Sequence, residues 1–302
     1  MDVKLYMHLH ETPSPRRAAL LSFGGRGAAA LPPALARLHL RRVRSGCETL
    51  SLGGRELRLD EDAYLIVDTG IEAVTSRAAA AAPATVRILV FGSESEGLAS
   101  ALRAAASDAS GAFFLPTLRS HGDPVSRQFE RVERAADAGG TGFEAEVAAL
   151  MQLMLEAEQR LHRRAHAIAT VKPATRRELF RRILVAADFI RSRYQQPLRL
   201  TDIAAAACLS RFHLLRLFEQ VHGMTPHAYL AHKRKTVALR LIAQTRLGLD
   251  EIALHSGFGS RSSLFRHLRS EPGASGKSIR TARSHAPVSQ ALQETIECST
   301  RV

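Results

Sequence analysis

The chain has 302 residues, of which 45% are apolar, so it can form two domains of ordinary size that each bury a core. Its formal net charge of +13 exceeds what solubility requires and points to a polyanionic partner, either nucleic acid or an anionic membrane. Residues 172–285 hold 21 Lys and Arg against 7 Asp and Glu, whereas the rest of the chain holds 21 against 22. The whole basic excess therefore lies in one C-terminal segment.

The composition argues against a disulfide framework, a zinc site and a membrane span. Cys47, Cys208 and Cys298 are far apart, odd in number and without a CxxC pair, which favours a reducing compartment. The N-terminus has no continuous apolar core of signal-peptide length, and no stretch approaches the roughly 20 apolar residues of a membrane span. We therefore expect a soluble cytoplasmic protein that does not bind membranes.

Residues 32–91 have the pattern of β-strands, because short apolar runs are separated by Gly, Asp and Pro. Apolar and polar residues alternate on both sides of a Gly-Gly dipeptide, the apolar positions being Leu50, Leu52, Leu57 and Leu59. Gly53 and Gly54 can take the positive φ values of a tight turn. The sequence therefore predicts a hairpin within a β-rich N-terminal domain.

Helices are expected after the strands. The segment GDPVSRQFERVERAADAGGTG predicts a charged helix that ends at the glycines of residues 139–142. A longer helix follows over residues 143–170, where no proline occurs before residue 173. Its apolar residues recur at three- and four-residue steps, namely Val147, Leu150, Met151, Met154, Leu155 and Leu161. We favour packing of this stripe on its own domain over the alternative, a dimer interface of helix against helix.

The most informative feature is an internal repeat with an offset of about 50 residues. LTDIAAAACLSRFHLLRLF, which starts at Leu200, aligns with LDEIALHSGFGSRSSLFRHL, which starts at Leu249. Each copy is typical of a short helix, a turn and a second helix. In the first copy Thr201 can cap the first helix and Ser210 the second, and in the second copy Gly257 can supply the positive φ of the turn.

A helix-turn-helix presents the start of its second helix to the DNA major groove, where arginine can donate two hydrogen bonds to guanine. The residues predicted to contact DNA are Arg211, Phe212, His213, Leu215 and Arg216 in the first copy, and Arg261, Ser262, Phe265 and Arg266 in the second. Phe212 and Phe265 could instead belong to the core, and Phe265 could reach a thymine methyl group.

The stretch between the two copies is free of internal proline after Pro226 and predicts one helix of nearly 20 residues. Such a helix spans roughly 27 Å, close enough to the ~34 Å repeat of DNA for one monomer to address successive major grooves. We expect its basic residues Lys233, Arg234 and Lys235 to be solvated or to face a protein partner rather than to read bases, and contact with DNA phosphate is the alternative.

Over residues 181–283 the chain resembles the AraC/XylS family of bacterial transcription regulators. The resemblance rests on the opening helix RRILVAADFIRSRY, on both copies of the repeat and on the basic helix between them. It implies an all-α domain with two helix-turn-helix units that binds double-stranded promoter DNA and contacts RNA polymerase. Cys208 stands where the family commonly has glycine, and the family pattern after the second copy is altered at Pro272, Gly276 and Ile279.

The fragment GCETLSLGGRELRLDEDAYLIVDTG resembles the ligand-sensing barrel that precedes this domain in many members of the family. It implies a cupin-like barrel that binds a small-molecule effector. The chain is thus expected to be an α+β multidomain protein and a homodimer. We expect an N-terminal β-rich barrel with helices over residues 1–170, a linker at 171–180, the DNA-binding domain at 181–283 and a disordered tail at 284–302.

The sequence offers no catalytic, cofactor or metal motif. His8 and His10 have an HxH spacing, but no third ligand is near them, so a strand or a disordered end of the chain is the favoured interpretation. Asp60, Glu61 and Asp62 are adjacent acids in a turn rather than a catalytic pair, and no Walker loop, GxSxG or GxGxxG occurs. Two alternatives remain open: a cupin-type enzyme that carries a DNA-binding domain, and an architectural protein that binds DNA of any sequence.

Overall fold

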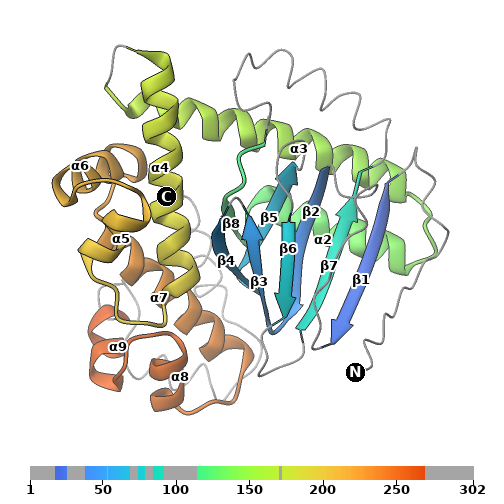
Figure 1. The fold of residues 1–302 in the computed structure, drawn as a ribbon. Helices are drawn as coiled ribbons and strands as arrows, with labels where there is room; N and C mark the ends of the chain where they lie inside the picture. Colours follow the sequence, from blue (N-terminus) through green and yellow to red (C-terminus); the bar gives the residue numbers. More distant parts are fainter. Residues whose placement is uncertain are drawn as a thin grey trace. The chain divides into compact units, whose positions relative to one another are not determined.

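The computed structural model of the chain describes residues 18–25, 38–52, 54–68, 74–78, 84–91, 114–169 and 172–268. The chain divides into two compact units, Met1–Arg163 and Arg164–Val302. The described part of the first unit contains sheets and helices, and that of the second is helical (Figure 1), as expected for the two parts of the chain. Some predictions lie outside the described residues, namely those for His8, His10, Pro272, Gly276, Ile279 and residues 284–302.

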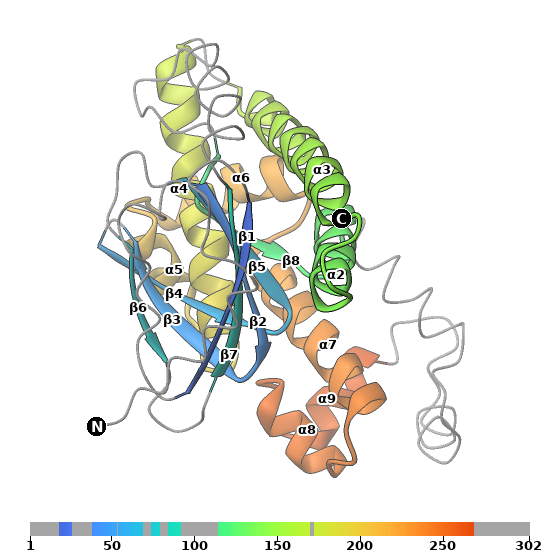
Figure 2. The same ribbon diagram turned by 90° about the vertical axis from the view of Figure 1, so that its right-hand side faces the viewer.

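The strands of the first unit form two antiparallel sheets (Figure 2). Their bounds are β1 Ala19–Gly25, β2 Leu38–Ser45, β3 Cys47–Leu52, β4 Arg55–Asp60, β5 Ala63–Asp68, β6 Val74–Ala78, β7 Ala84–Val90 and β8 Leu118–Ser120. The larger sheet has the order β1-β7-β2-β5-β8 and the smaller one β4-β3-β6. Neighbours in each sheet are mostly distant in sequence, so the sheets depend on long-range pairing rather than on hairpins alone.

The predicted hairpin is confirmed. β3 pairs antiparallel with β4, with Leu50 opposite Leu57. All four alternating leucines are buried, and Gly54 has a φ of +72° in the turn between the strands. No atom lies within 4 Å of where a Cβ would stand on Gly54, so glycine is favoured there by its backbone angle and not by lack of space.

The two sheets share an apolar core. The leucines of the hairpin pack with inward-facing residues of the larger sheet, among them Leu65, Val67, Val86 and Ile88. The most deeply buried of the ion pairs described in this unit joins Arg41 and Glu48: Arg41 Nη1 donates to Glu48 Oε1 at 2.8 Å, and neither side chain is more than 2% exposed. Burial lowers the pKa of the Arg41 guanidinium, and the nearby Glu48 carboxylate opposes this effect.

Helices α2 (Pro124–Asp137) and α3 (Phe143–Arg164) cover the other face of the larger sheet (Figures 1 and 2). The Asp123 carboxylate caps α2 by accepting a hydrogen bond from the Ser126 N–H at 2.8 Å. The predicted apolar stripe of α3 packs on this sheet through Val147, Leu150, Met151 and Met154. This supports packing on its own domain, the interpretation that we favoured over a dimer interface.

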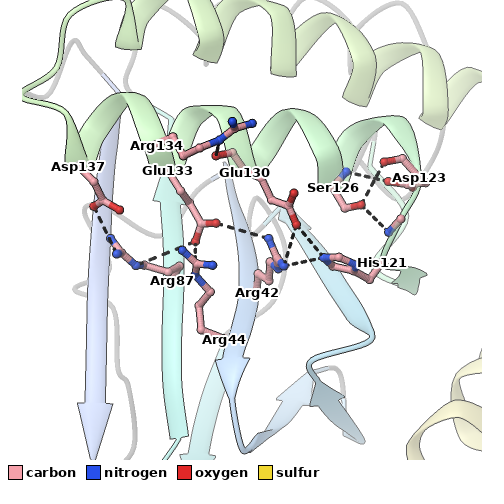
Figure 3. Close-up of polar contacts among 11 residues, drawn as sticks. Arg42, Arg44, Arg87, His121, Asp123, Ser126, Glu130, Glu133, Arg134 and Asp137 are labelled. Atoms are coloured by element: carbon pink, nitrogen blue, oxygen red, sulfur yellow. Dashed lines mark hydrogen bonds and ion pairs between the residues drawn. The ribbon is translucent and has the colours of Figure 1, made fainter. Parts of the chain in front are cut away.

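A row of charged groups continues the interface between α2 and the larger sheet (Figure 3). We call it the charged seam; its members are Arg42, Arg44, Arg87, His121, Glu130, Glu133 and Asp137. Glu133 is 1% exposed and lies 3.4 Å from Arg42 Nη1 and 3.2 Å from Arg44 Nε. Burial raises the pKa of the Glu133 carboxyl although three guanidinium groups act in the opposite direction. At the outer end of the charged seam, Arg87 pairs with Asp137, which is 55% exposed.

The described part of the second unit consists of helices. Their bounds are η2 Ala165–Ala167, α4 Pro173–Arg193, α5 Leu200–Ala206, α6 Arg211–His222, α7 Pro226–Gln244, α8 Leu249–His255 and α9 Arg261–Leu268. The expected linker at residues 171–180 is mostly helical, because α4 already begins at Pro173. Proline is favoured in a first helical turn, and the following ATRRELFRRIL contains no residue that interrupts a helix. Among the described residues, no helix is both long and apolar enough to cross a membrane.

Candidate nucleic-acid interface

The first copy of the repeat forms α5 and α6, separated by a short turn. The Asp202 carboxylate accepts a hydrogen bond from the Arg199 backbone N–H at 3.1 Å, which closes the start of α5. Thr201 therefore lies inside the first turn, and the prediction that it caps this helix is wrong. Asp202, the third residue of α5, was the better indicator of where the helix starts. Its carboxylate reaches back to a backbone N–H that has no partner within the helix.

The start of α6 is capped as predicted: Ser210 Oγ accepts a hydrogen bond from the His213 N–H at 3.3 Å. The helix ends at Gly223, which has a φ of +70°. Its buried face consists of Leu214, Leu217, Phe218 and Val221. Packing of this face fixes which residues at the beginning of α6 point to solvent.

The turn between α5 and α6 contains the only described residue other than glycine with a positive φ. Cys208 has a φ of +51°, so it takes the left-handed conformation that the family resemblance associates with glycine at this place. An L-residue costs roughly 1–2 kcal/mol more in this region than in a right-handed one. The Cys208 carbonyl accepts a hydrogen bond from Arg182 Nη1 at 3.0 Å, which helps to hold the turn.

The second copy forms α8 and α9, and the starts of these helices are capped in the same way as those of α5 and α6. The Glu251 carboxylate accepts a hydrogen bond from the Gly248 N–H at 2.7 Å, and Ser260 Oγ accepts one from the Ser263 N–H at 3.2 Å. The helices pack through a core that contains Ala238, Leu239, Ile242, Leu249, Ile252, Ala253, Phe258, Leu264 and Leu268. The two copies thus agree in their caps and in their buried positions.

Gly257 occupies the place in the second turn that Cys208 occupies in the first. Its φ is +82°, as the sequence predicted. A Cβ on Gly257 would lie 2.5 Å from the Tyr194 carbonyl oxygen and 2.9 Å from Gln195 Cα. The second turn therefore requires glycine for two reasons, its backbone angle and the close approach of the end of α4.

Most of the residues predicted to contact DNA are exposed on the first two turns of α6 and α9. The exposed ones are Arg211, Phe212, Arg216, Arg261, Ser262 and Arg266, and the partly buried ones are His213, Leu215 and Phe265. Counted from the capping serines, arginine stands at the first and sixth positions of both helices. Each helix start therefore carries two guanidinium groups on a rigid support, together with the partial positive charge of the helix N-terminus.

The two phenylalanines differ in their surroundings. Phe212 is 82% exposed, so it is not part of the core. Phe265 is partly buried, packs against the core of the second copy, and has the Arg261 guanidinium 5.5 Å from its ring centroid. Of the two, Phe212 presents the larger apolar surface to a partner.

The connecting helix α7 begins at Pro226, as predicted, and Thr225 Oγ1 caps it by accepting from the Ala228 N–H at 3.2 Å. Arg234, which we expected to be solvated or to face a partner, is instead structural. Its Nε donates to the Tyr194 carbonyl at 2.7 Å and its Nη2 to the Gln196 carbonyl at 2.8 Å. The guanidinium thereby binds carbonyl groups that the end of α4 leaves without helical partners.

A second polar cluster, around His222, was also missed by the sequence analysis. Arg164 Nη2 donates to the Val221 carbonyl at 3.0 Å and to His222 Nδ1 at 3.1 Å. The His222 ring stacks on Phe218 with centroids 4.4 Å apart. Burial, and then the charges of Arg164 and Arg191, lower the pKa of His222 to about 3, so His222 is neutral at physiological pH.

The low pKa of His222 predicts an acid-sensitive second unit. Because an unfolded histidine has a pKa near 6.5, only the unfolded chain gains a proton at this site as the pH falls from 7 to 5. The free energy of unfolding should therefore decrease by about 2 kcal/mol over this range from this residue alone. Urea unfolding at pH 7 and pH 5 measures the effect. The His222→Phe variant keeps a ring stacked on Phe218, and its free energy of unfolding should fall by about 2 kcal/mol less between pH 7 and pH 5 than that of the unmodified protein. An equal fall in both proteins would contradict the low pKa of His222.

No group of three or more His, Cys, Asp or Glu side chains suited to a metal ion occurs within the parts of the chain that the structure describes. Asp60 and Asp62 lie at the turn between β4 and β5, where the Asp60 carboxylate accepts a hydrogen bond from the Asp62 N–H at 3.1 Å. This contact fits the interpretation of the two acids as turn residues.

A family model described as a helix-turn-helix domain matches residues 203–282. The chain is also similar to a probable transcriptional regulator, LumQ, of Photobacterium leiognathi, with 30% identity over 82 residues, 27% of this chain and 33% of the relative. A lactose operon transcription activator of Staphylococcus xylosus is 32% identical over 73 residues, 24% of this chain and 26% of the relative. The chain thus spans about a third or less of these relatives.

Among solved structures, the chain is similar to a transcriptional regulator (AraC-type DNA-binding domain-containing proteins) from Chromobacterium violaceum. The identity is 27%, the match covers 35% of this chain and 95% of that one, and the TM-score is 0.32.

Proposed function

We propose that this protein is a sequence-specific DNA-binding regulator of transcription, since residues 203–282 match a family model described as a helix-turn-helix domain. The observation that carries the proposal is the repeated surface on α6 and α9. At both helix starts a serine caps the helix, one face is buried, and two arginines stand at equivalent exposed positions. Such a surface suits base edges in the major groove, since guanidinium groups can bind guanine with two hydrogen bonds.

We further propose that α5–α6 and α8–α9 are two helix-turn-helix units that read successive major grooves. Helix α7 joins them and has 19 residues, which corresponds to roughly 28 Å. This length is of the order of the ~34 Å DNA repeat. In this proposal Arg211, Arg216, Arg261, Arg266 and Ser262 provide polar contacts, and the remaining predicted residues shape the surface around them.

For the first unit we propose a cupin-like effector domain that also mediates homodimerisation. The support is its architecture of two sheets around an apolar core, with helices on one face. A small-molecule effector would act by favouring one arrangement of the protein over another. Contact with RNA polymerase, and activation through it, belong to the same proposal and rest on the family resemblance.

Selection of DNA by the purified full-length protein tests the proposed function. Genomic fragments that it retains are sequenced, and the enriched sequence then competes with random DNA at a fixed salt concentration. We expect the enriched sequence to bind about 10³-fold tighter or more, and both affinities to fall steeply as salt rises. Equal competition by random DNA would favour the architectural alternative, and binding to neither would contradict a role on DNA.

A further inference from the structure

Three parts of the second unit meet at residues 194–196, the short segment that follows α4. Arg234, on α7, donates to two carbonyl groups of this segment, at 2.7 and 2.8 Å. From the same segment, Gln195 Nε2 donates to the carbonyl of His255, the last residue of α8, at 2.9 Å. The end of α4 therefore contacts both the connecting helix and the second copy of the repeat.

The contact with the turn of the second copy is close. A Cβ on Gly257 would lie 2.5 Å from the Tyr194 carbonyl oxygen and 3.0 Å from Arg234 Nε. Arg234 is partly buried, and burial lowers the pKa of its guanidinium, which nevertheless stays charged at physiological pH. Since hydrogen bonds from a charged donor are stronger than neutral ones, Arg234 resists sliding of α7 and the second turn along the end of α4.

Helix α4 also holds the turn of the first copy. Arg182 Nη1 donates to the Cys208 carbonyl at 3.0 Å, and Arg182 Nε donates to Glu178 Oε1 at 2.8 Å, which orients the guanidinium. About 18 Å of helix separates Arg182 from Tyr194. Helix α4 and the segment after it thus form one support for the turns of both copies.

Helix α7 is connected to α6 and to α8 by non-helical segments, residues 223–225 and 245–248. Backbone rotation in either segment would change the direction of α7 relative to its neighbours. Arg234 is the ninth of the 19 residues of α7. Its contact with the end of α4 therefore acts near the middle of the helix that joins the two copies.

We propose that Arg234 is a positioning residue that fixes the separation of α6 and α9 and thereby limits binding to DNA sites with one spacing between their halves. It does so by holding α7 and the second turn to the end of α4. This inference rests on the proposed function for its consequence at DNA, whereas the separation of the two helix pairs can be measured on the free protein.

The DNA test compares the enriched sequence with versions in which one base pair is inserted or removed between the two half-sites. Dissociation constants are measured with the full-length protein and with Arg234→Lys, which keeps the charge but cannot bind two carbonyl groups as a planar guanidinium does. The matched control is Lys235→Arg, the reverse exchange at the next position of α7. A phosphate contact at either position would change all affinities alike and leave the ratio between DNA versions unchanged.

The unmodified protein should bind the altered versions about 30-fold or more weakly, because one base pair displaces the second half-site by about 3.4 Å and about 35°. In Arg234→Lys this ratio should fall to about threefold or less, and in Lys235→Arg it should persist. General destabilisation would weaken binding to every version and would not move the ratio. Should Arg234→Lys not fold, Gln195→Ala, which removes only the hydrogen bond to the His255 carbonyl, should lower the ratio in the same direction.

The separation itself is measured without DNA, by electron spin resonance between labels on Cys208 and on Leu254→Cys. Both positions are exposed, and neither belongs to the proposed DNA-binding residues. Cys47→Ser and Cys298→Ser leave these two thiols as the only ones. Arg234→Lys should broaden the distribution of distances between the labels, and Lys235→Arg should not.

An unchanged spacing ratio in Arg234→Lys, or equal changes in Arg234→Lys and Lys235→Arg, would overturn the proposal. If the unmodified protein selects no DNA but the distances broaden only in Arg234→Lys, the positioning role stands and the role on DNA falls. If DNA is selected with a strict spacing and the distances do not respond to Arg234→Lys, the function stands and the positioning role falls.

Discussion

Replacing Gly257 with alanine is expected to lower the free energy of unfolding of the second unit by about 3 kcal/mol or more. A positive φ alone costs an L-residue roughly 1–2 kcal/mol. In addition, the new Cβ would lie 2.5 Å from the Tyr194 carbonyl oxygen, a backbone atom that the Arg234 guanidinium also binds. The end of α4 and the turn before α9 would have to separate, and loss of such packed contacts adds to the cost.

Cys208→Ala is the matched control, since residue 208 stands at the same place in the first turn and already carries a Cβ at positive φ. We expect its free energy of unfolding to change by less than about 1 kcal/mol. Urea unfolding, followed by circular dichroism, measures both variants. Equal losses at residues 208 and 257 would contradict the view that a Cβ added at residue 257 destabilises the second turn.

Removal of the sixth-position arginines is expected to affect different parts of one DNA site. Arg216→Ala should weaken binding by roughly 1–3 kcal/mol and relax discrimination at its own base pair, and Arg266→Ala should do the same about one DNA turn away. Both side chains are exposed on helix starts whose buried faces fix their direction. Base-by-base protection of a bound operator and competition with single-base variants measure these effects.

Arg163→Ala is the control for charge, because this exposed arginine lies in the first unit and outside both helix pairs. A phosphate contact would weaken all sequences alike and reduce the slope of the salt dependence by about 1, which distinguishes it from a base contact. Suppose that Arg266→Ala leaves affinity and footprint unchanged while Arg216→Ala abolishes both. The two-groove proposal would then be wrong, and the protein would read DNA through α6 alone.

Local patterns predicted the elements that depend on neighbours in sequence. Alternating leucines around Gly53 and Gly54 were enough to predict the β3–β4 hairpin. The spacing of apolar residues by three and four positions was enough to predict α3. The repeat also placed Ser210 correctly as a cap. In each case the stabilising contact is made within a few residues, so its signal lies in one short window.

Contacts over long sequence distances could not be predicted in this way. Arg234 reaches carbonyl groups about 40 residues away, and Arg164 reaches a carbonyl 57 residues away. In the sequence Arg234 lies in the basic segment and Arg164 near the end of the helix predicted over residues 143–170, and solvation is the usual expectation for an arginine. The error at Thr201 has a different cause, because two residues competed for the cap and the acidic one made the contact.

The buried ion pairs of the first unit bear on how the DNA experiments behave. Added electrolyte screens charges in water over roughly 8–10 Å at ordinary ionic strength, but it acts weakly on charges that water does not reach. Arg41 and Glu48 are almost wholly enclosed, as is Glu133 in the charged seam, whereas Asp137 at its end is exposed. Electrolyte should therefore act on the exposed members of the charged seam, which are Arg44, Glu130 and Asp137, more than on Glu133. If the proposed function holds, we therefore expect a salt titration of the full-length protein to act mainly on the solvent-facing arginines of α6 and α9, so that DNA dissociates before the core of the first unit is affected.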